Sequence, residues 1–479
     1  MVINNLLFNF IIILCIIYLF QERKNSMKDI HDISKKYYSS AIELLKEWIK
    51  IDSTYDESTS SKNHPFGLGV AKALKYIADI ARKDGFEVDE CDGYCTEISY
   101  GEGPLIAIYA HCDVVPVSGE WKFPPFSATV EDDIMYGRGT SDDKGPAMAA
   151  YHALKLLKDE HLIKNYRVSL VIGGNEESGS KCLEYYFDHL HKPYPAYGFT
   201  PDGDFPLIYG EKAIATFSGS IDKVFDKIES LDAGVVINSV IDRADVKLNA
   251  TIDVKHLENY CINHGLKFNY KDNNLTFYGK AAHGSLPQLG INAGLHLLIF
   301  LGQEFNYPEL VNIGEGYLDG EGHALGVYYE SKLLHETTYN VGLISYKDGH
   351  LQYRVNFRYP ENVDVYKVIE KLNQMNVGII TFEGTSSYLL FDPESPMIKT
   401  LMRCYQEETG DYDSKPMAIG GGTYAKESKN TVAFGSHFVG REDHIHDCNE
   451  KIHLDDLRAS ISIYAKAINE LGLLAGVSK

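Results

Sequence analysis

The sequence predicts an α/β protein with a mixed sheet flanked by helices, into which a second, α+β domain is inserted. Three observations support this prediction. Short apolar runs alternate with amphipathic helical patterns from residue 34 to residue 209, which is typical of an α/β sheet. Between residues 210 and 392 the pattern changes to strands with one polar face, as in antiparallel sheets. The 479 residues are also too many for one hydrophobic core.

The first part of the chain alternates helices and strands. Leu45, Trp48 and Ile49 belong to the one-sided apolar stripe of an amphipathic helix, and Gly85 ends the next helix. Pro146 suits the first turn of a third helix. In order, we expect helices over 34–51 and 70–83, strands over 86–88 and 105–109, a helix over 147–157, a strand over 168–172, a helix over 183–190 and a strand over 197–200.

The middle of the chain predicts the inserted domain, and the last part returns to the first. In the middle we expect strands over 213–219, 248–254, 275–278 and 351–357, with helices over 294–305 and 365–373. The last part predicts a helix over 396–408, a glycine-rich loop over 420–423, a strand over 431–434 and a helix over 454–471. The domains are therefore predicted to span 27–209 together with 393–479, and 210–392.

Composition limits the class of protein and its partners. Hydrophobic residues make up 44% and charged residues 24%, which is ordinary for a soluble globular protein. A formal net charge of -21 disfavours nucleic acid or an anionic membrane surface as a partner. The eight cysteines have no regular spacing, which favours a reducing compartment, the cytoplasm, over a disulfide-linked secreted fold.

The first 26 residues form an apolar extension with two interpretations. The run over residues 6–20 is shorter than the approximately 20 residues of a comfortable membrane span, and it lacks the basic region and cleavage site of a signal peptide. Met27 opens a normal soluble start, so we expect translation to begin there. The alternative is an uncleaved membrane anchor through residues 6–20.

Acidic and histidine side chains recur where predicted strands end. They lie in four segments, residues 109–116, 137–146, 175–180 and 200–204. Ligands of open α/β sheets bind in the crevice beyond the strand ends. Imidazole nitrogen and carboxylate oxygen are zinc ligands, so the four segments together indicate one metal centre.

These segments resemble the motifs of the M20 family of co-catalytic zinc peptidases. Within that family the chain is most similar to PepV/Sapep-type dipeptidases, including the carnosinase-like Xaa-His enzymes. The resemblance runs from Met27 to the C-terminus and is carried by residues 111–113, 137–145, 175–180, 279–285 and 420–424. It implies a zinc-exopeptidase-like catalytic domain and an inserted lid. It also implies a monomer, because a long lid in this subfamily mimics the second subunit of dimeric relatives.

The resemblance implies two divalent metal ions per chain. Asp142 would bridge them, with His111 and Asp202 completing one site and Glu177 and His446 the other. Zinc is the expected metal, although oxygen and imidazole ligands also suit manganese and cobalt. The family pattern His-x-x-Asn-Glu favours His446 as the last ligand, with His444 as the alternative.

The resemblance also implies roles in catalysis. Asp113 lies two residues after His111, on the same side of an extended chain, and would orient its imidazole. Glu176 would be the general base for a water that bridges the metals. His283 would donate to the oxyanion of the tetrahedral intermediate.

Four further positions match residues that hold the substrate carboxylate. Arg358 would bind it in a bidentate manner. Gly421 and Gly422 would present backbone N–H groups to it. Asn238 matches a lid position, although its sequence context departs from the family pattern.

The expected activity is hydrolysis of the peptide bond of unmodified dipeptides. Two alternatives remain. One is another M20 activity, an N-acyl amino acid deacylase or desuccinylase. The other is a catalytically silent binding protein on the same fold, against which the complete ligand set and Glu176 argue.

Overall fold

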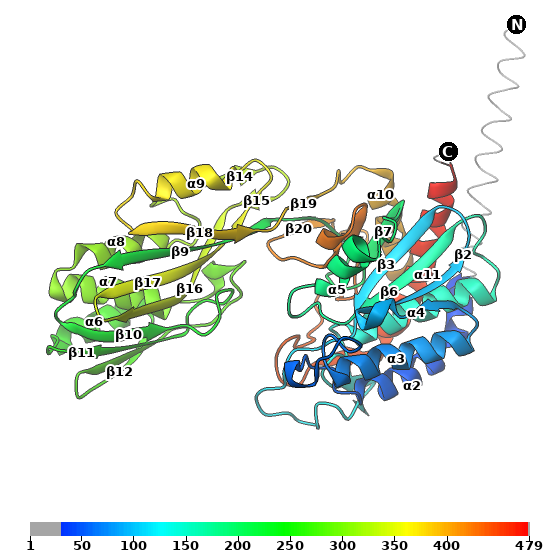
Figure 1. Cartoon of the computed structure of the whole chain (residues 1–479), viewed down its shortest axis with the longest axis horizontal. Coiled ribbons are helices and arrows are strands. Elements are labelled where there is room, and N and C mark those ends of the chain that lie inside the picture. The colour runs from blue at the N-terminus through cyan, green and yellow to red at the C-terminus, as the bar shows by residue number, and fades with distance from the viewer. Residues whose placement is uncertain (1–29, 478–479) are drawn as a thin grey trace, which may run out of the picture. The chain divides into compact units, whose positions relative to one another are not determined.

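The structure is a computed structural model that describes residues 30–477, in which the chain divides into two compact units (Figure 1). The first unit contains the described residues up to Tyr209, Phe391–Met417 and the segment from Thr423 onward. The second unit contains Gly210–Leu390 and the short segment Ala418–Gly422. That short segment lies in the range that the sequence assigns to the first domain, so the chain enters the second unit twice.

A nine-stranded mixed sheet has most of its strands in the first unit, whereas β8 and β20 cross the boundary between the units and β19 belongs to the second. Its path is β1-β2-β6-β3-β7-β21-β8-β19, and β20 pairs with β8. The strands are β1 (Glu87–Asp89), β2 (Cys95–Gly101), β3 (Leu105–His111), β6 (Arg167–Gly173), β7 (Tyr197–Thr200), β8 (Ile208–Glu211), β19 (Leu389–Leu390), β20 (Met417–Ile419) and β21 (Thr431–Ala433).

The middle of this sheet is parallel. β3 pairs in parallel with both β6 and β7, and β7 pairs in parallel with β21. In both β3 and β6 every residue except the first is buried, as expected for parallel strands covered on both faces. The carboxyl ends of β3, β6 and β7 therefore lie at one edge of the sheet.

Helices cover the sheet. α4 packs on β3 and β6 and against α2 and α11, and α11 packs against α10. The helices and turns of the first unit are η1 (Lys35–Tyr37), α2 (Tyr38–Ile49), η2 (Glu57–Thr59), α3 (Leu68–Lys83), η3 (Cys91–Gly93), α4 (Lys144–Asp159), α5 (Lys181–Glu184), η4 (Tyr185–His189), α10 (Pro396–Thr409), η6 (Tyr424–Glu427) and α11 (Leu454–Val477).

A small antiparallel sheet in the first unit connects the loop before α4 to the C-terminal part of the chain. Its order is β22-β5-β4, from β4 (Thr129–Glu131), β5 (Ile134–Tyr136) and β22 (Lys451–His453). Lys451 pairs with Tyr136, the last residue of β5.

The second unit is built on an eight-stranded antiparallel sheet of order β12-β13-β11-β10-β16-β17-β9-β18 (Figure 1). The strands are β9 (Ala213–Asp222), β10 (Ile228–Ala233), β11 (Arg243–Leu248), β12 (Lys267–Lys271), β13 (Asn274–Tyr278), β16 (Thr338–Lys347), β17 (His350–Tyr359) and β18 (Ile379–Thr385). Its remaining elements are α6 (Val254–His264), η5 (Pro287–Leu289), α7 (Ala293–Phe305), α8 (Pro308–Tyr317), β14 (Glu330–Ser331), β15 (His335–Glu336) and α9 (Val365–Leu372).

The hydrophobic core of the second unit lies between this sheet and its helices. α7 contacts β11, β13 and β16, and α8 contacts β16. The first ten residues of α7 are all buried, and the Asn292 side chain caps the helix by accepting a hydrogen bond from the Leu295 N–H at 3.0 Å.

The predicted strand over 248–254 is wrong. β11 ends at Leu248, and α6 begins at Val254. The physical reason is Asp253, whose carboxylate accepts the Lys255 N–H at 2.9 Å and caps the helix. The β-branched residues Ile252 and Val254 favour a strand locally, but the hydrogen bonds of the Asp253 side chain stabilise the first turn of a helix that begins at Val254.

Among residues 30–477, no helix has both the length and the apolar character that crossing a bilayer requires. The apolar run over residues 6–20 and the expected start at Met27 lie outside the described residues.

Burial of His152 in α4 predicts a pH-dependent stability of the first unit. The ring is fully buried, with Nδ1 at 3.0 Å from the Met148 carbonyl oxygen and Nε2 at 3.3 Å from Ser40 Oγ. Burial lowers the pKa of His152 to about 4. The unfolded chain takes up this proton near pH 6.5 and the folded chain does not, so stability falls as pH drops from about 6.5 towards 4. The loss reaches about 3 kcal/mol at the lower end of this range.

This prediction is tested by urea unfolding between pH 4 and 7. Both tryptophans, Trp48 and Trp121, lie in the first unit, so fluorescence reports its unfolding. His152→Gln should show a flatter pH profile than the wild type, whereas His350→Gln, at an exposed histidine of the second unit, should follow the wild type. Parallel profiles for wild type and His152→Gln would contradict the prediction.

Candidate metal centre

Three of the predicted ligands lie at the common edge where parallel strands end. His111 is the last residue of β3, Glu177 lies in the loop after β6, and Asp202 lies in the loop after β7. Because β3 is the neighbour of both β6 and β7, these side chains reach the same space.

The predicted ligands form two groups that share Asp142. His111, Asp142 and Asp202 form one group, and Asp142, Glu177 and His446 form the other, with the donor atoms of each group within 4.8 Å of one another. His111 Nε2 lies 2.9 Å from Asp142 Oδ1 and 3.8 Å from Asp202 Oδ2. The other oxygen of the shared carboxylate, Asp142 Oδ2, lies 2.9 Å from His446 Nε2. One carboxylate thus faces an imidazole on each side.

The structure brings His446 into this arrangement and leaves His444 out of it. His446 Nε2 lies 3.1 Å from Glu177 Oε2, although the two residues are 269 positions apart in the chain. His444 Nε2 instead faces the exposed Glu442 carboxylate at 3.8 Å.

Several ionisable side chains with shifted pKa values lie close together at this edge of the sheet. Burial, and then the charge of Asp142, raises the pKa of Glu177 to about 7. Burial raises the pKa of Glu176 well above its usual value, with Asp202 adding to the rise. Hydrogen bonds with Asp142 and Glu177 raise the pKa of His446 to about 11. Carboxylates that repel one another in a buried space favour a bound cation.

The donor set fits divalent metal ions. It combines imidazole nitrogens with carboxylate oxygens, the ligand types of zinc, manganese and cobalt sites. Asp142 offers one oxygen to each group, as a carboxylate shared by two ions requires. The donor chemistry therefore supports two cations, one on each side of Asp142.

Asp113 connects His111 to the loop that carries Glu176 and Glu177. Its carbonyl oxygen lies 3.0 Å from His111 Nδ1. Its carboxylate accepts the backbone N–H groups of Glu176 at 3.0 Å and Glu177 at 3.1 Å. Asp113 thus contacts the imidazole through its carbonyl oxygen and through its carboxylate, whose Oδ1 lies 3.4 Å from His111 Nδ1, and the same carboxylate holds the acidic loop.

Asp143 holds the other end of the His111 backbone. Its Oδ2 accepts the His111 N–H at 3.0 Å, and its Oδ1 is buried with no hydrogen-bond partner among the described residues. The Asp143 side chain therefore fixes the backbone at the end of β3, close to the shared Asp142.

The predicted substrate residues all lie in the second unit. The loops that carry Asn238 and His283 pair through a bridge between Ser239 and His283, and the Gly284 N–H donates to the Asn238 carbonyl oxygen at 2.7 Å. His283 Nδ1 lies 2.6 Å from Ser285 Oγ. Asn238 and His283 are exposed.

Arg358 lies beside the glycine-rich loop. It is buried in β17, donates through Nε to Asn356 Oδ1 at 2.9 Å, and donates through Nη1 to the Gly420 carbonyl oxygen. Burial lowers the pKa of Arg358 to about 10, so the guanidinium stays charged at neutral pH. Gly421 and Gly422 continue this loop within the second unit.

Asn340 is a further residue that supports the loop carrying Asn238. Its side chain in β16 is buried, and its Nδ2 donates to the carbonyl oxygens of Ile237 at 2.8 Å and Ser239 at 2.9 Å, on either side of Asn238. Asn340 therefore fixes the backbone that presents Asn238. No motif marks it, because its partners are backbone groups.

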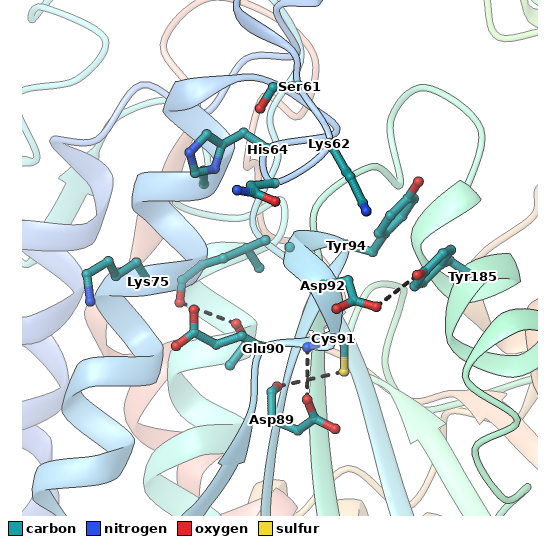
Figure 2. A pocket seen from close by; sticks show the side chains of 15 residues that line it. Ser61, Lys62, His64, Lys75, Asp89, Glu90, Cys91, Asp92, Tyr94 and Tyr185 are labelled. Atoms are coloured by element: carbon teal, nitrogen blue, oxygen red, sulfur yellow. Dashed lines mark hydrogen bonds between the residues drawn. The ribbon is translucent and has the colours of Figure 1, made fainter.

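A cavity of about 780 Å³ in the first unit is separate from the metal centre (Figure 2). None of the predicted site residues lines it. Its acidic side chains are engaged: Asp92 accepts the Tyr185 hydroxyl at 2.9 Å, and Asp89 pairs with Lys192 at 2.7 Å. The group Asp89, Cys91 and Glu97 resembles a metal site, but the Lys192 ammonium group bridges its two carboxylates.

Comparisons with known proteins agree on one family. Residues 107–470 match the family described as "Peptidase family M20/M25/M40". A protein of Staphylococcus haemolyticus (strain JCSC1435) named "Putative dipeptidase SH1171" is 36% identical over 464 residues, covering 91% of this chain and 98% of that protein. "Putative dipeptidase YtjP" of Bacillus subtilis (strain 168) is 34% identical over 459 residues, covering 89% and 96%.

Solved structures share the fold. Human carnosine dipeptidase 1 superposes with a TM-score of 0.57 at 14% identity, covering 93% of this chain and 99% of that one. The dipeptidase Dug1p of Saccharomyces cerevisiae gives a TM-score of 0.56 at 13% identity, covering 94% and 99%. These likenesses confirm the predicted fold class.

Proposed function

The chain belongs to peptidase family M20/M25/M40, and on that basis we propose that it is a dinuclear-metal dipeptidase that hydrolyses unmodified dipeptides. The observation that carries the proposal is the position of Asp142, whose two oxygens each face an imidazole of a different donor group. A single bridging carboxylate is what two neighbouring catalytic ions require.

The proposal assigns each donor group one cation. His111, Asp142 and Asp202 would hold one, and Asp142, Glu177 and His446 the other, with zinc as the first candidate and manganese or cobalt as alternatives. Bound there, the ions would supply Lewis-acid charge to the scissile carbonyl group and ease the ionisation of water.

In the proposal Glu176 handles the proton. Its backbone is held by Asp113, and burial together with Asp202 raises its pKa, which makes the carboxylate a better proton acceptor. Glu176 takes a proton from the attacking water and delivers it to the nitrogen of the leaving amine, which gives a carboxylic acid and an amine. Transfer of the acid's proton to the amine then leaves a carboxylate and an ammonium group.

The domain over residues 210–392 would act as a lid. The domain over residues 27–209 and 393–479 would be the catalytic domain. Arg358, Asn238 and the N–H groups of Gly421 and Gly422 would hold the substrate carboxylate. His283 would donate to the developing oxyanion, and its contact with Ser285 supports a fixed ring orientation. We propose a monomer, with this lid in place of a partner subunit.

We also propose that the protein acts in the cytoplasm. Among residues 30–477 no cysteine forms a disulfide, which suits a reducing compartment.

The proposal predicts a preference for dipeptides with free amino and carboxyl ends. A clamp on the terminal carboxylate sets its distance to the reacting carbonyl group, and one extra residue adds about 3.3–3.6 Å of chain. A free amino group also gains an acidic partner near the metal centre. Dipeptides should therefore exceed tripeptides, dipeptide amides and N-acyl amino acids in kcat/KM.

The test is kcat/KM for these four substrate classes at fixed metal and pH. Dipeptide amides are the matched control for the carboxylate clamp, because they differ only at that group. An N-acetyl or N-succinyl amino acid as the best substrate would make the deacylase or desuccinylase the better assignment. Metal binding without turnover of any of the four would favour a silent binding protein.

A further inference from the structure

Glu450 is a buried carboxylate whose hydrogen bonds converge on the loop that carries Asp142. Its side chain is fully buried. Its Oε1 accepts three backbone N–H groups, from Gly139 at 3.0 Å, Ser141 at 2.9 Å and Asp142 at 3.2 Å. A buried carboxylate that accepts several backbone N–H groups holds them in a fixed arrangement.

The other oxygen of Glu450 pairs with a buried arginine of the same loop. Arg138 Nη1 donates to Glu450 Oε2 at 2.7 Å, and both side chains are 1% exposed. The Arg138 guanidinium also lies over the Trp121 ring, at 5.3 Å from its centroid. Removing one partner of such a buried pair leaves the other charge uncompensated, which is costly.

The backbone around Glu450 holds the same loop at both ends. The Gly137 N–H donates to the Glu450 carbonyl oxygen at 2.9 Å, and Ser141 Oγ donates to the Lys451 carbonyl oxygen at 2.7 Å. Gly145 is the second residue of α4, and a Cβ at this position would collide with the Thr140 carbonyl oxygen. The start of α4 therefore also packs closely against the loop.

We infer that Glu450 is a positioning residue that fixes the Asp142 carboxylate between the two donor groups. The inference rests on the proposed function, in which these groups hold two cations. The Asp142 N–H is bound to Glu450, and those of Gly139 and Ser141 share the same acceptor, so the backbone that carries the Asp142 carboxylate is held in place. Because Asp142 serves both groups, loss of Glu450 should weaken both ions together.

The test is Co²⁺ binding to the full-length, metal-free protein, measured by competition with a chromogenic chelator and by visible absorption. Residues that orient metal ligands typically contribute about 10–100-fold to metal affinity. Glu450→Ala should lose about that factor at both sites and change the spectrum of the loaded protein. Glu450→Gln should lose less, because an amide oxygen still accepts the three N–H groups.

Two controls separate positioning from general damage. Glu442→Gln changes an acid of the same segment whose side chain is 82% exposed, and should bind both ions as the wild type does. Asp202→Asn changes a donor of one group only, and should weaken one ion while leaving the other in place.

The inference is overturned if folded Glu450→Ala binds both ions with wild-type affinity and spectrum, or if it weakens one ion only. Should Glu450→Ala fail to fold, Glu450→Gln decides the matter, and wild-type affinity at both sites would again overturn it. A wild-type protein that binds two Co²⁺ ions but cleaves no dipeptide would overturn the proposed function alone, since the affinity ratio still tests Glu450.

Discussion

Replacing Glu176 by glutamine is expected to lower kcat by about 10²–10⁴-fold, the usual contribution of a general base. The same variant should keep two divalent ions, because Glu176 belongs to neither donor group. Glutamine has nearly the same shape as glutamate but does not accept a proton. The Glu176 N–H that binds Asp113 is also unchanged, so the acidic loop should stay in place.

Metal content and turnover must be measured on the same preparations. Glu184→Gln is the matched control, since Glu184 is an exposed acid that follows the same loop, and it should turn over at the wild-type rate. Glu177→Gln should lose metal as well as activity, because Glu177 is a donor of the second group. Wild-type turnover by Glu176→Gln, or an emptied metal centre, would refute the role assigned to Glu176.

His283→Ala and Arg358→Ala should impair the reaction in different ways. An oxyanion exists only along the reaction path, so loss of His283 should lower kcat by roughly 10²–10³-fold with a smaller change in KM. The substrate carboxylate is present in both ground and transition states, so loss of Arg358 should act mainly by raising KM.

Arg354→Ala is the control for the arginine. Arg354 lies on the same strand as Arg358, but it is partly exposed and pairs with Glu383. It should leave both kinetic constants close to those of the wild type. Identical changes in kcat and KM for His283→Ala and Arg358→Ala would remove the distinction between the two roles.

The parallel strands β3 and β6 of the first unit are predictable because both of their faces are buried, whereas β2, which is also largely buried, is not among the predicted strands. β3 and β6 are apolar runs of a length that only a buried strand or a short core helix has. β11 is not among the predicted strands, although Arg243, Asp245 and Lys247 alternate with buried residues as in a strand with one polar face. The error over 248–254 arises because β-branched residues there surround the helix cap Asp253.

The donor groups could be found from the sequence because each side chain follows a predicted strand or lies in a recognisable motif. Glu450 and Asn340 could not be assigned a role in this way. Glu450 Oε1 and Asn340 Nδ2 bind backbone groups, which every residue has, and the Arg138 partner of Glu450 lies 312 residues away, so no local pattern of residue types reveals them. Only the fold shows that Glu450 reaches Asp142, 308 residues away.

The position of β21 has a consequence for synthesis of the chain. β21 (Thr431–Ala433) pairs with β7 on one side and with β8 on the other, so it fills a gap between strands made more than 200 residues earlier. Until it leaves the ribosome, β7 has an open edge, and open strand edges pair readily with other chains. His446 follows only after β21, so the second donor group is complete only once nearly the whole chain has been made. The edge of β7 therefore stays exposed while more than 200 further residues are synthesised.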